Sequence, residues 1–251
     1  PEGLHPVLTS GKLELKVPEV ITFDLVGDLK ADTMPRDIAL YLLGNFHAQI
    51  KGKAVALQGE FLTNLSPAGK MTICNILPEG GAVTAFFVPA GDEDESIDHI
   101  IDVDGIEPMV AIPPEPTSVK PVRELAGTPI TVAIVGGCSA GRIEDMEAVA
   151  EILATADVHR DVTLLITPAS QKVAGEMDAR GFSSLFREKG ALVLPPGCGP
   201  CPGKHLGVLA PGDVAIATIV RNTPGRMGSP EAQIYLGSPY TVARAAVHGK
   251  L

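Results

Sequence analysis

The sequence has no tryptophan, few aromatic residues and no long apolar run. Phenylalanine, tyrosine and tryptophan together make up 4% of the 251 residues. No apolar stretch reaches the roughly eighteen residues that a membrane-spanning helix needs, so we expect no transmembrane segment. The start of the chain also lacks the basic and apolar zones of a secretory signal peptide.

Positive charge and cysteine are also scarce. The 20 Lys and Arg residues against 30 Asp and Glu give a formal net charge of −10. This charge argues against a nucleic-acid or anionic-membrane partner, because both favour basic surfaces. The 4 cysteines are unevenly spaced and do not match the disulfide framework of a secreted protein. We therefore expect a cytoplasmic protein.

Three of the cysteines lie in segments rich in glycine. Cys198 and Cys201 form a C-x-x-C pair, and Cys138 follows the apolar run VAIVGG. Gly199 and Pro200 permit a tight turn within the pair, so that both thiolates can face one centre. The pair and the upstream cysteine together form an arrangement of three thiolates that can bind metal.

The spacing alone leaves several interpretations open. A redox C-x-x-C usually opens a helix near the start of a thioredoxin-like unit, whereas this pair lies late and among prolines. Structural zinc needs four protein ligands, and the fourth could be Cys74, His205 or His5. An iron–sulfur cluster is held by thiolates, and three of them would leave one iron open to a substrate. Spacing supports zinc and a cluster equally, and unrelated buried thiols are a further explanation.

Hydrophobic periodicity predicts an α/β protein. Alternating or continuous short apolar runs predict strands, and longer amphipathic runs predict helices. The expected strands cover residues 19–27, 53–62, 82–90, 130–137, 161–170, 191–197 and 213–220. The expected helices cover residues 35–46, with Thr33 as a cap, a turn and helix within 64–82, and residues 141–156 and 170–190. Strand, loop and helix repeat in this order, which predicts parallel strands with helices on both faces.

We expect two α/β/α domains with mainly parallel sheets. The assigned segments are a connector at 1–18, a first α/β domain at 19–112, a Pro-rich linker at 113–124 and a second α/β domain at 125–251 that carries the C-x-x-C pair. The linker is placed where prolines cluster in IPPEPTSVKPV. Cys138, Cys198 and Arg221 each follow a predicted strand. Ligands collect at the carboxyl ends of strands in such sheets, so we expect these residues to lie at a functional site.

Three motifs carry a resemblance to a known family. They are MTICNILPEGGA at 71–82, VAIVGGCSAGRIEDM at 132–146 and the segment from CGPCPGKHLG to the end of the chain. They occur in the same order in the aconitase superfamily, and they are most similar to the large subunit of 3-isopropylmalate dehydratase and homoaconitase. The resemblance implies an aconitase-like iron–sulfur domain in a hydro-lyase that acts on a hydroxy di- or tricarboxylic acid such as 3-isopropylmalate.

The resemblance also implies roles for individual residues. Cys138, Cys198 and Cys201 would bind a [4Fe–4S] cluster, for which zinc is the alternative. Asn75 and Glu79 match the family's N-x-x-x-E pair, which reaches the cluster and its bound water, and their spacing favours one helical face. Arg221 and Arg226 match the arginines that bind the substrate's carboxylates, a task that suits the planar guanidinium fork.

The chain departs from the family at Ser139, Ala140 and Val220. The family usually has Thr-Asn at the first two positions and Asn at the third. The family's first domain, with its G-D-S-H-T motif, and the swivelling domain that supplies a serine base have no match in this sequence. We therefore expect a hetero-oligomer, in which a separate swivelling-domain small subunit and another chain supply these parts. Two other functions are considered: a non-catalytic cluster- or zinc-binding assembly or sensor protein, and a divergent dehydratase similar to aconitase X.

Overall fold

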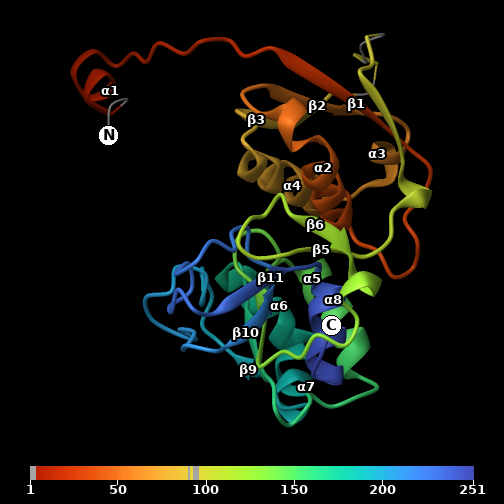
Figure 1. Ribbon diagram of the computed structural model, residues 1–251, viewed down its shortest axis with the longest axis vertical. Helices are drawn as coiled ribbons and strands as arrows, with labels where there is room; N and C mark the ends of the chain where they lie inside the picture. The colour runs from red at the N-terminus through yellow and green to blue at the C-terminus, as the bar shows by residue number, and fades with distance from the viewer. Residues whose placement is uncertain (1–3, 90, 93–95) are drawn as a thin grey trace.

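Two mainly parallel sheets organise the chain in the computed structural model, which describes residues 4–89, 91–92 and 96–251 (Figure 1). The expected α/β class is confirmed. The helices are α1 (Leu4–Ser10), α2 (Pro35–Ile50), α3 (Phe61–Asn64), α4 (Pro67–Ile76), α5 (Ile143–Leu153), α6 (Gln171–Ala179), α7 (Phe182–Glu188) and α8 (Pro239–His248). Short 3-10 turns are η1 (Leu77–Gly80), η2 (Val103–Gly105) and η3 (Val122–Leu125). The strands are β1 (Val20–Val26), β2 (Ala54–Gln58), β3 (Thr84–Phe87), β4 (His99–Asp102), β5 (Met109–Ala111), β6 (Val119–Pro121), β7 (Val132–Gly136), β8 (Thr163–Thr167), β9 (Leu192–Val193), β10 (Val214–Ala217) and β11 (Gln233–Leu236).

The first sheet has four parallel strands in the order β3-β2-β1-β4. Phe23 of the central strand β1 lies opposite Leu57 on one side and His99 on the other. Parallel neighbours need long crossovers, and α2 supplies the one between β1 and β2, while α3 and α4 supply the next. The sheet therefore arises from the repeated strand and helix pattern that the sequence predicts.

The N-cap of helix α2 lies one residue later than expected. Met34, not Thr33, occupies the N-cap position, and Thr33 Oγ1 instead donates to the Lys30 carbonyl at 2.8 Å. Asp37 in the first turn accepts from the Met34 amide at 2.8 Å and thereby satisfies one amide of the helix start. Pro35 suits the first helical position because its missing amide hydrogen would have no partner there.

The second sheet has seven strands in the order β6-β5-β11-β10-β7-β8-β9. Its parallel part runs from β11 to β9, and β5 and β6 form an antiparallel edge. Strand β5 lies in the segment that we expected to end the first domain, and β6 lies in the expected linker. Their backbones pair with the second sheet, and Met109, Val110 and Ala111 are buried there, so membership of the second sheet begins at Met109.

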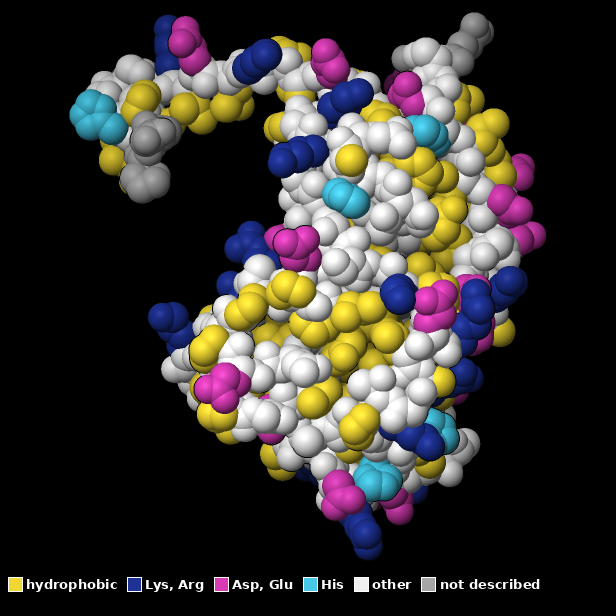
Figure 2. Space-filling view, in the orientation of Figure 1, with side chains coloured by type: hydrophobic (Ala, Val, Ile, Leu, Met, Phe, Trp, Pro, Cys, Tyr) yellow, Lys and Arg dark blue, Asp and Glu magenta, His cyan; other side chains and the backbone are white. Residues whose placement is uncertain are grey.

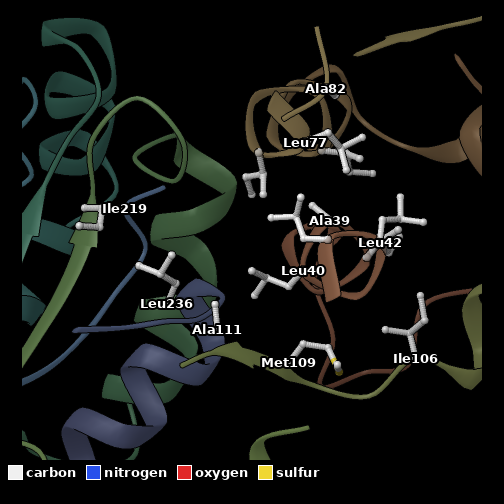
Figure 3. Close-up of a cluster of buried hydrophobic side chains, with 14 of the residues drawn as sticks. Ala39, Leu40, Leu42, Leu77, Ala82, Ile106, Met109, Ala111, Ile219 and Leu236 are labelled. Carbon is white, nitrogen blue, oxygen red and sulfur yellow. The ribbon is translucent and has the colours of Figure 1, made fainter. Parts of the chain in front are cut away.

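A continuous apolar core joins the two sheets. Helices α5, α7 and α8 pack against one face of the second sheet, where Val135, Val149 and Phe186 are fully buried. The other face shares a core with α2 and the first sheet (Figure 3). In that core Leu40 of α2 lies between Leu77 on one side and Leu236 on the other (Figure 3). Helix α2 thus holds the end of α4 close to the loops of the second sheet.

The N-terminal arm, residues 4–17, is exposed along its whole length. Helix α1 and the extended stretch after it lie away from the two sheets (Figure 1). Residues 1–3 of the expected connector lie outside the described residues. Within the described part of the chain, no helix is both long enough and apolar enough to cross a membrane.

Candidate functional site

Three cysteines from two loops line one small pocket at the carboxyl edge of the second sheet. Cys138 follows β7, and Cys198 and Cys201 follow β9, while Ile219 and Val220 after β10 close the apolar side. Cys138 and Cys198 are exposed, and Cys201 is half-buried. The parallel strands end at the same edge, which brings together thiols that lie about sixty residues apart in the sequence.

The Cys138 loop begins at Gly136, whose backbone conformation and close contact with Thr167 permit only glycine. Gly136 has φ 131°, and an added Cβ would lie 1.9 Å from the Thr167 carbonyl oxygen. The Gly137 amide donates to that same carbonyl at 3.1 Å, and the Gly136 amide donates to Thr218 Oγ1 at 2.9 Å. The loop is therefore fixed between β8 and β10 before it reaches Cys138.

The C-x-x-C pair forms the tight turn that the sequence predicts. The Cys201 amide donates to the Cys198 carbonyl at 3.2 Å. Gly199 has φ 53°, and an added Cβ would lie 2.3 Å from Thr167 Oγ1. Thr167 at the end of β8 thus supports both cysteine loops, a role that the sequence did not suggest.

Side chains from α4 hold the Cys138 loop from the first half of the chain. Arg142 donates to the Cys138 carbonyl at 3.2 Å and to Thr72 Oγ1 at 3.0 Å. Ser66, the N-cap of α4, donates to Glu144 at 2.6 Å. Helix α4 of the first half therefore supports the Cys138 loop of the second sheet.

The departures from the family pattern have structural explanations. Ser139 is buried and its hydroxyl donates to the Thr218 carbonyl at 2.9 Å, so this side chain fixes the loop. Ala140 is fully buried. Val220 lines the cysteine pocket and presents an apolar side chain there.

Arg226 and Cys201 are in direct contact. The Nη2 atom of Arg226 donates to the Cys201 sulfur at 3.1 Å. The Nε atom of Arg226 is buried and has no partner among the described residues. The structure thus brings one of the two predicted carboxylate-binding arginines to a predicted cluster ligand.

Arg221 and Glu79 form an ion pair between the two halves of the chain. Arg221 Nε lies 2.7 Å from Glu79 Oε2, and the arginine side chain is 54% exposed while the glutamate is 15% exposed. The hydrogen bond and charge of Glu79 raise the pKa of Arg221, and Cys201 adds to the effect through its charge. Glu79 and Arg221 are therefore neighbours, and Val220, next to Arg221 in the chain, lines the cysteine pocket.

The remaining predicted residues lie at different depths. Asn75 is exposed on the last turn of α4, and η1 begins between it and Glu79. Cys74 packs against the shared core, and burial raises its pKa to about 11, so it stays a neutral thiol. His205 is exposed on the loop after the C-x-x-C pair, and His5 lies on the distant N-terminal arm.

Arg36 is a charged residue near the site that the sequence did not single out. It is fully buried at the start of α2, and its Nη2 atom donates to the carbonyl of Ile219, next to the cysteine pocket. Burial lowers the pKa of Arg36 to about 10, and the charges of Asp145, Asp37 and Cys138 oppose that shift. Burial also raises the pKa of Asp37 and of Asp145 to about 6. No local pattern marks Arg36, because Ile219, Asp145 and Cys138 lie more than a hundred residues away in the sequence.

The three thiols of the pocket are the type of ligand that binds an iron–sulfur cluster. Thiolates are the ligands of such clusters, and each thiolate binds its own iron. The pocket has a volume of about 20 Å³, so a bound cluster would extend toward the solvent-exposed sides of Cys138 and Cys198. In the described part of the chain, no three His, Cys, Asp or Glu side chains form a group that could hold a single metal ion.

The fold and the site define an α/β protein with a three-cysteine pocket at the carboxyl edge of a mainly parallel sheet. The sequence profile of the Aconitase family (aconitate hydratase) matches residues 3–100 and 90–249. The chain belongs to the aconitase family, as the motif resemblance predicts.

Two relatives illustrate the similarity. The probable methanogen homoaconitase large subunit of Methanothermobacter thermautotrophicus is 35% identical over 97% of this chain and 62% of that protein. The 3-isopropylmalate dehydratase large subunit 1 of Methanopyrus kandleri is 36% identical over 98% of this chain and 64% of that protein. The chain spans less than two thirds of the length of these relatives.

A solved structure shows the same fold at low identity. The holo-form of Thermococcus kodakaraensis aconitase X superposes with a TM-score of 0.53 at 14% identity. The match covers 92% of this chain and 55% of that chain. This comparison supports the architecture of the two sheets.

Proposed function

We propose that this chain is the cluster-bearing part of an iron–sulfur hydro-lyase that acts on a hydroxy di- or tricarboxylic acid such as 3-isopropylmalate. The convergence of Cys138, Cys198 and Cys201 on one pocket, beside the ion pair of Glu79 and Arg221, carries the proposal. Relatives named 3-isopropylmalate dehydratase and homoaconitase support this substrate class.

The three thiols would hold a [4Fe–4S] cluster at the mouth of their pocket. When bound, the cluster supplies an iron that acts as a Lewis acid on the substrate hydroxyl. Arg226 donates a hydrogen bond to the Cys201 sulfur and so helps to set the charge on that ligand. Thr167 and the glycines beside it keep the two cysteine loops at their separation.

Arg221 is placed to bind a carboxylate of the substrate. Its Nε–H bonds Glu79, which leaves the other N–H groups of the guanidinium available at an exposed position. Planar guanidinium groups bind carboxylates through two parallel hydrogen bonds. Glu79 would orient this arginine and, with Asn75, face the water or hydroxyl that enters and leaves.

Two parts of the site would come from other polypeptides. General base catalysis needs a group within hydrogen-bond reach of the proton it takes, and the family's serine base has no match in this sequence. We propose that a separate swivelling-domain small subunit supplies it and that another chain supplies the family's first domain. The large-subunit names of the relatives support the small-subunit partner.

A second candidate is a cluster-binding assembly or sensor protein without lyase activity, or a dehydratase for another substrate. Val220 and Ala140 favour it, because each stands where the family pattern has a hydrogen-bonding side chain. An apolar side chain at the pocket removes a contact that a carboxylate or hydroxyl would use.

The test is metal and sulfide analysis of the anaerobically purified chain, with a visible spectrum. We expect about four irons with matching sulfide per chain and a broad visible absorption. Cys198→Ser should abolish both, whereas Cys74→Ser, the matched control at a thiol outside the pocket, should retain them. Stoichiometric zinc without sulfide would overturn the cluster assignment, and loss of iron in Cys74→Ser alone would overturn the ligand assignment.

A further inference from the structure

A large hollow lies on the opposite side of α8 from its contacts with the second sheet. Its volume is about 630 Å³, within the range of small-molecule sites. Tyr240, Arg244 and His248 of α8 line it, and their spacing of four residues places them on one side of the helix. None of the residues that line this hollow lines the cysteine pocket.

Basic side chains converge on this hollow from four separate segments. They are Lys30 after β1, Arg123 in η3, Arg244 and His248 in α8, and Lys250 beyond it. Lys, Arg and His side chains gather on the lower right of the face shown in Figure 2, beside α8 and the C-terminus of Figure 1. The net charge of the whole chain is −10, so this hollow is a local concentration of basic residues in an acidic chain.

Only part of this positive charge is neutralised within the hollow. Arg123 pairs with Glu107 at 2.7 Å, and Asp32 is the other acidic side chain of the lining. Among the described residues, Lys30, Arg244, His248 and Lys250 form no ion pair. Lys30, Arg244 and Lys250 therefore line the hollow as cations without an ion pair among the described residues, although Lys30 acts on Glu107 through its charge.

One of these cations is already held in a fixed orientation. The guanidinium of Arg244 lies 4.5 Å from the centroid of the Tyr240 ring, and its Nη2 atom is 3.3 Å from the tyrosine hydroxyl. A guanidinium that is held in place loses less entropy when it binds an anion. The apolar floor of Pro108, Val122 and Ala245 would contact the carbon skeleton of such a ligand.

We propose that this hollow binds a small organic polyanion that carries at least two phosphate or carboxylate groups. Arg244 would bind one anionic group through its planar fork, and Lys30 and Lys250 would bind the other as point charges. This ligand site is separate from the cysteine pocket, and the inference does not depend on the function proposed for that pocket.

The test is titration calorimetry of the full chain with pyrophosphate and, separately, with citrate, at constant ionic strength. We expect saturable binding of at least one of them at a single site. Arg244→Gln combined with Lys250→Gln should weaken it about tenfold or more, because charge-assisted hydrogen bonds are lost. Binding of pyrophosphate alone would identify a phosphorylated ligand, and binding of citrate alone a polycarboxylate.

The matched control is Arg160→Gln combined with Lys172→Gln, which removes the same charge from exposed positions outside the hollow. It should bind like the unmodified chain, and thermal unfolding should be unchanged in both double variants. Arg221→Gln should also bind normally, which separates this site from the carboxylate-binding arginine beside the cysteine pocket. Absence of saturable binding, equal weakening in the control, or loss in Arg221→Gln would overturn the proposal.

Discussion

At the scale of single residues, the two arginines beside the cysteines differ in what they contact. Arg226 bonds the sulfur of Cys201, and Arg221 bonds Glu79 across the two halves of the chain. Hydrogen bonds to cluster sulfurs raise the reduction potential, whereas a carboxylate contact acts on substrate affinity. Under the proposed function, the same residue type would therefore have two distinguishable effects within one site.

We expect Arg226→Gln to lower the reduction potential of the loaded protein, because the sulfur loses a charged donor. Arg221→Lys should leave the potential unchanged and should raise KM for substrate by about tenfold or more, since the paired hydrogen bonds of the fork are lost. The measurements are a redox titration of each variant and steady-state kinetics with the partner subunits present. Equal potentials in Arg226→Gln and the unmodified protein would contradict the role given to the sulfur contact.

Asp145 provides a prediction on pH. Its side chain accepts from the Arg142 amide at 2.9 Å, and burial raises its pKa to about 6. Because the folded pKa lies above the unfolded value, the contribution of Asp145 is most favourable at low pH and is lost as pH rises through about 6. Asparagine keeps the acceptor oxygen and does not ionise.

Asp145→Asn should therefore gain stability relative to the unmodified chain as pH rises. We expect the difference in free energy of unfolding to shift by about 1–3 kcal/mol in favour of the variant between about pH 4 and pH 7. Urea unfolding at both values measures it. Asp161→Asn, at an exposed aspartate, is the control and should show no comparable shift. A constant difference across this range would show that Asp145 titrates at its ordinary pKa in the folded protein.

At the scale of elements, α2 links the two sheets through both apolar and charged contacts. Its apolar side chains share a core with the second sheet, and Arg36 at its start bonds the Ile219 carbonyl. Loss of Arg36 would remove the positive charge that acts on Asp37 and one of the two, with Arg142, that act on Asp145. The start of α2 thus supports the loop that carries Val220 and Arg221.

Arg36→Met should destabilise the chain by about 3–5 kcal/mol, as is typical when one member of a buried charged group is removed. Urea unfolding measures this loss, and Arg160→Met, at an exposed arginine, should change stability by less than about 0.5 kcal/mol. We also expect Arg36→Met to retain less iron than the unmodified chain under identical reconstitution. A change in stability as small as that of the control would contradict the linking role of Arg36.

The elements that the sequence predicted are those with a strong local signal. The strands from β7 to β10 and helix α5 follow from apolar runs and from a stripe that includes Met146 and Val149. The turn at Gly199 and Pro200 follows from the special backbone of these residue types. The loops that follow these strands lie at one edge of the sheet, and this placement accounts for the cysteine pocket.

Other features depend on contacts between distant segments and have no local signal. Strands β5 and β6 are three residues long, and only their pairing with β11 assigns them to the second sheet. The sulfur contact of Arg226 and the burial of Arg36 likewise exist only after both halves have packed together. Hydrophobic periodicity shows which side chains of a segment are buried, but it does not show which other segment packs against them.

At the scale of the whole molecule, apolar side chains are exposed on both the arm and the first sheet. Leu8, Leu15 and Val17 of the N-terminal arm are 75%, 77% and 87% exposed, and Ile100 of β4 is 68% exposed. Figure 2 shows such side chains on the arm and on the upper part of the molecule. Parallel sheets are usually covered on both faces, so these surfaces are suited to contact another polypeptide.

We expect the chain to dehydrate its substrate only when the swivelling-domain subunit and a chain with the family's first domain are added. The proton that leaves the substrate needs a base within hydrogen-bond reach, and the function proposed for this chain assigns it the thiols, Glu79, Asn75 and the two arginines without the family's serine base. The measurement is substrate turnover with each combination of separately purified, cluster-loaded components. Val17→Asp should reduce turnover of the complete mixture through weaker association, because an exposed apolar contact becomes charged, while its cluster spectrum alone stays unchanged. The matched control is Lys172→Asp, at an exposed position on α6, which should leave turnover unchanged. Turnover by the isolated chain at the rate of the complete mixture would show that it needs neither partner.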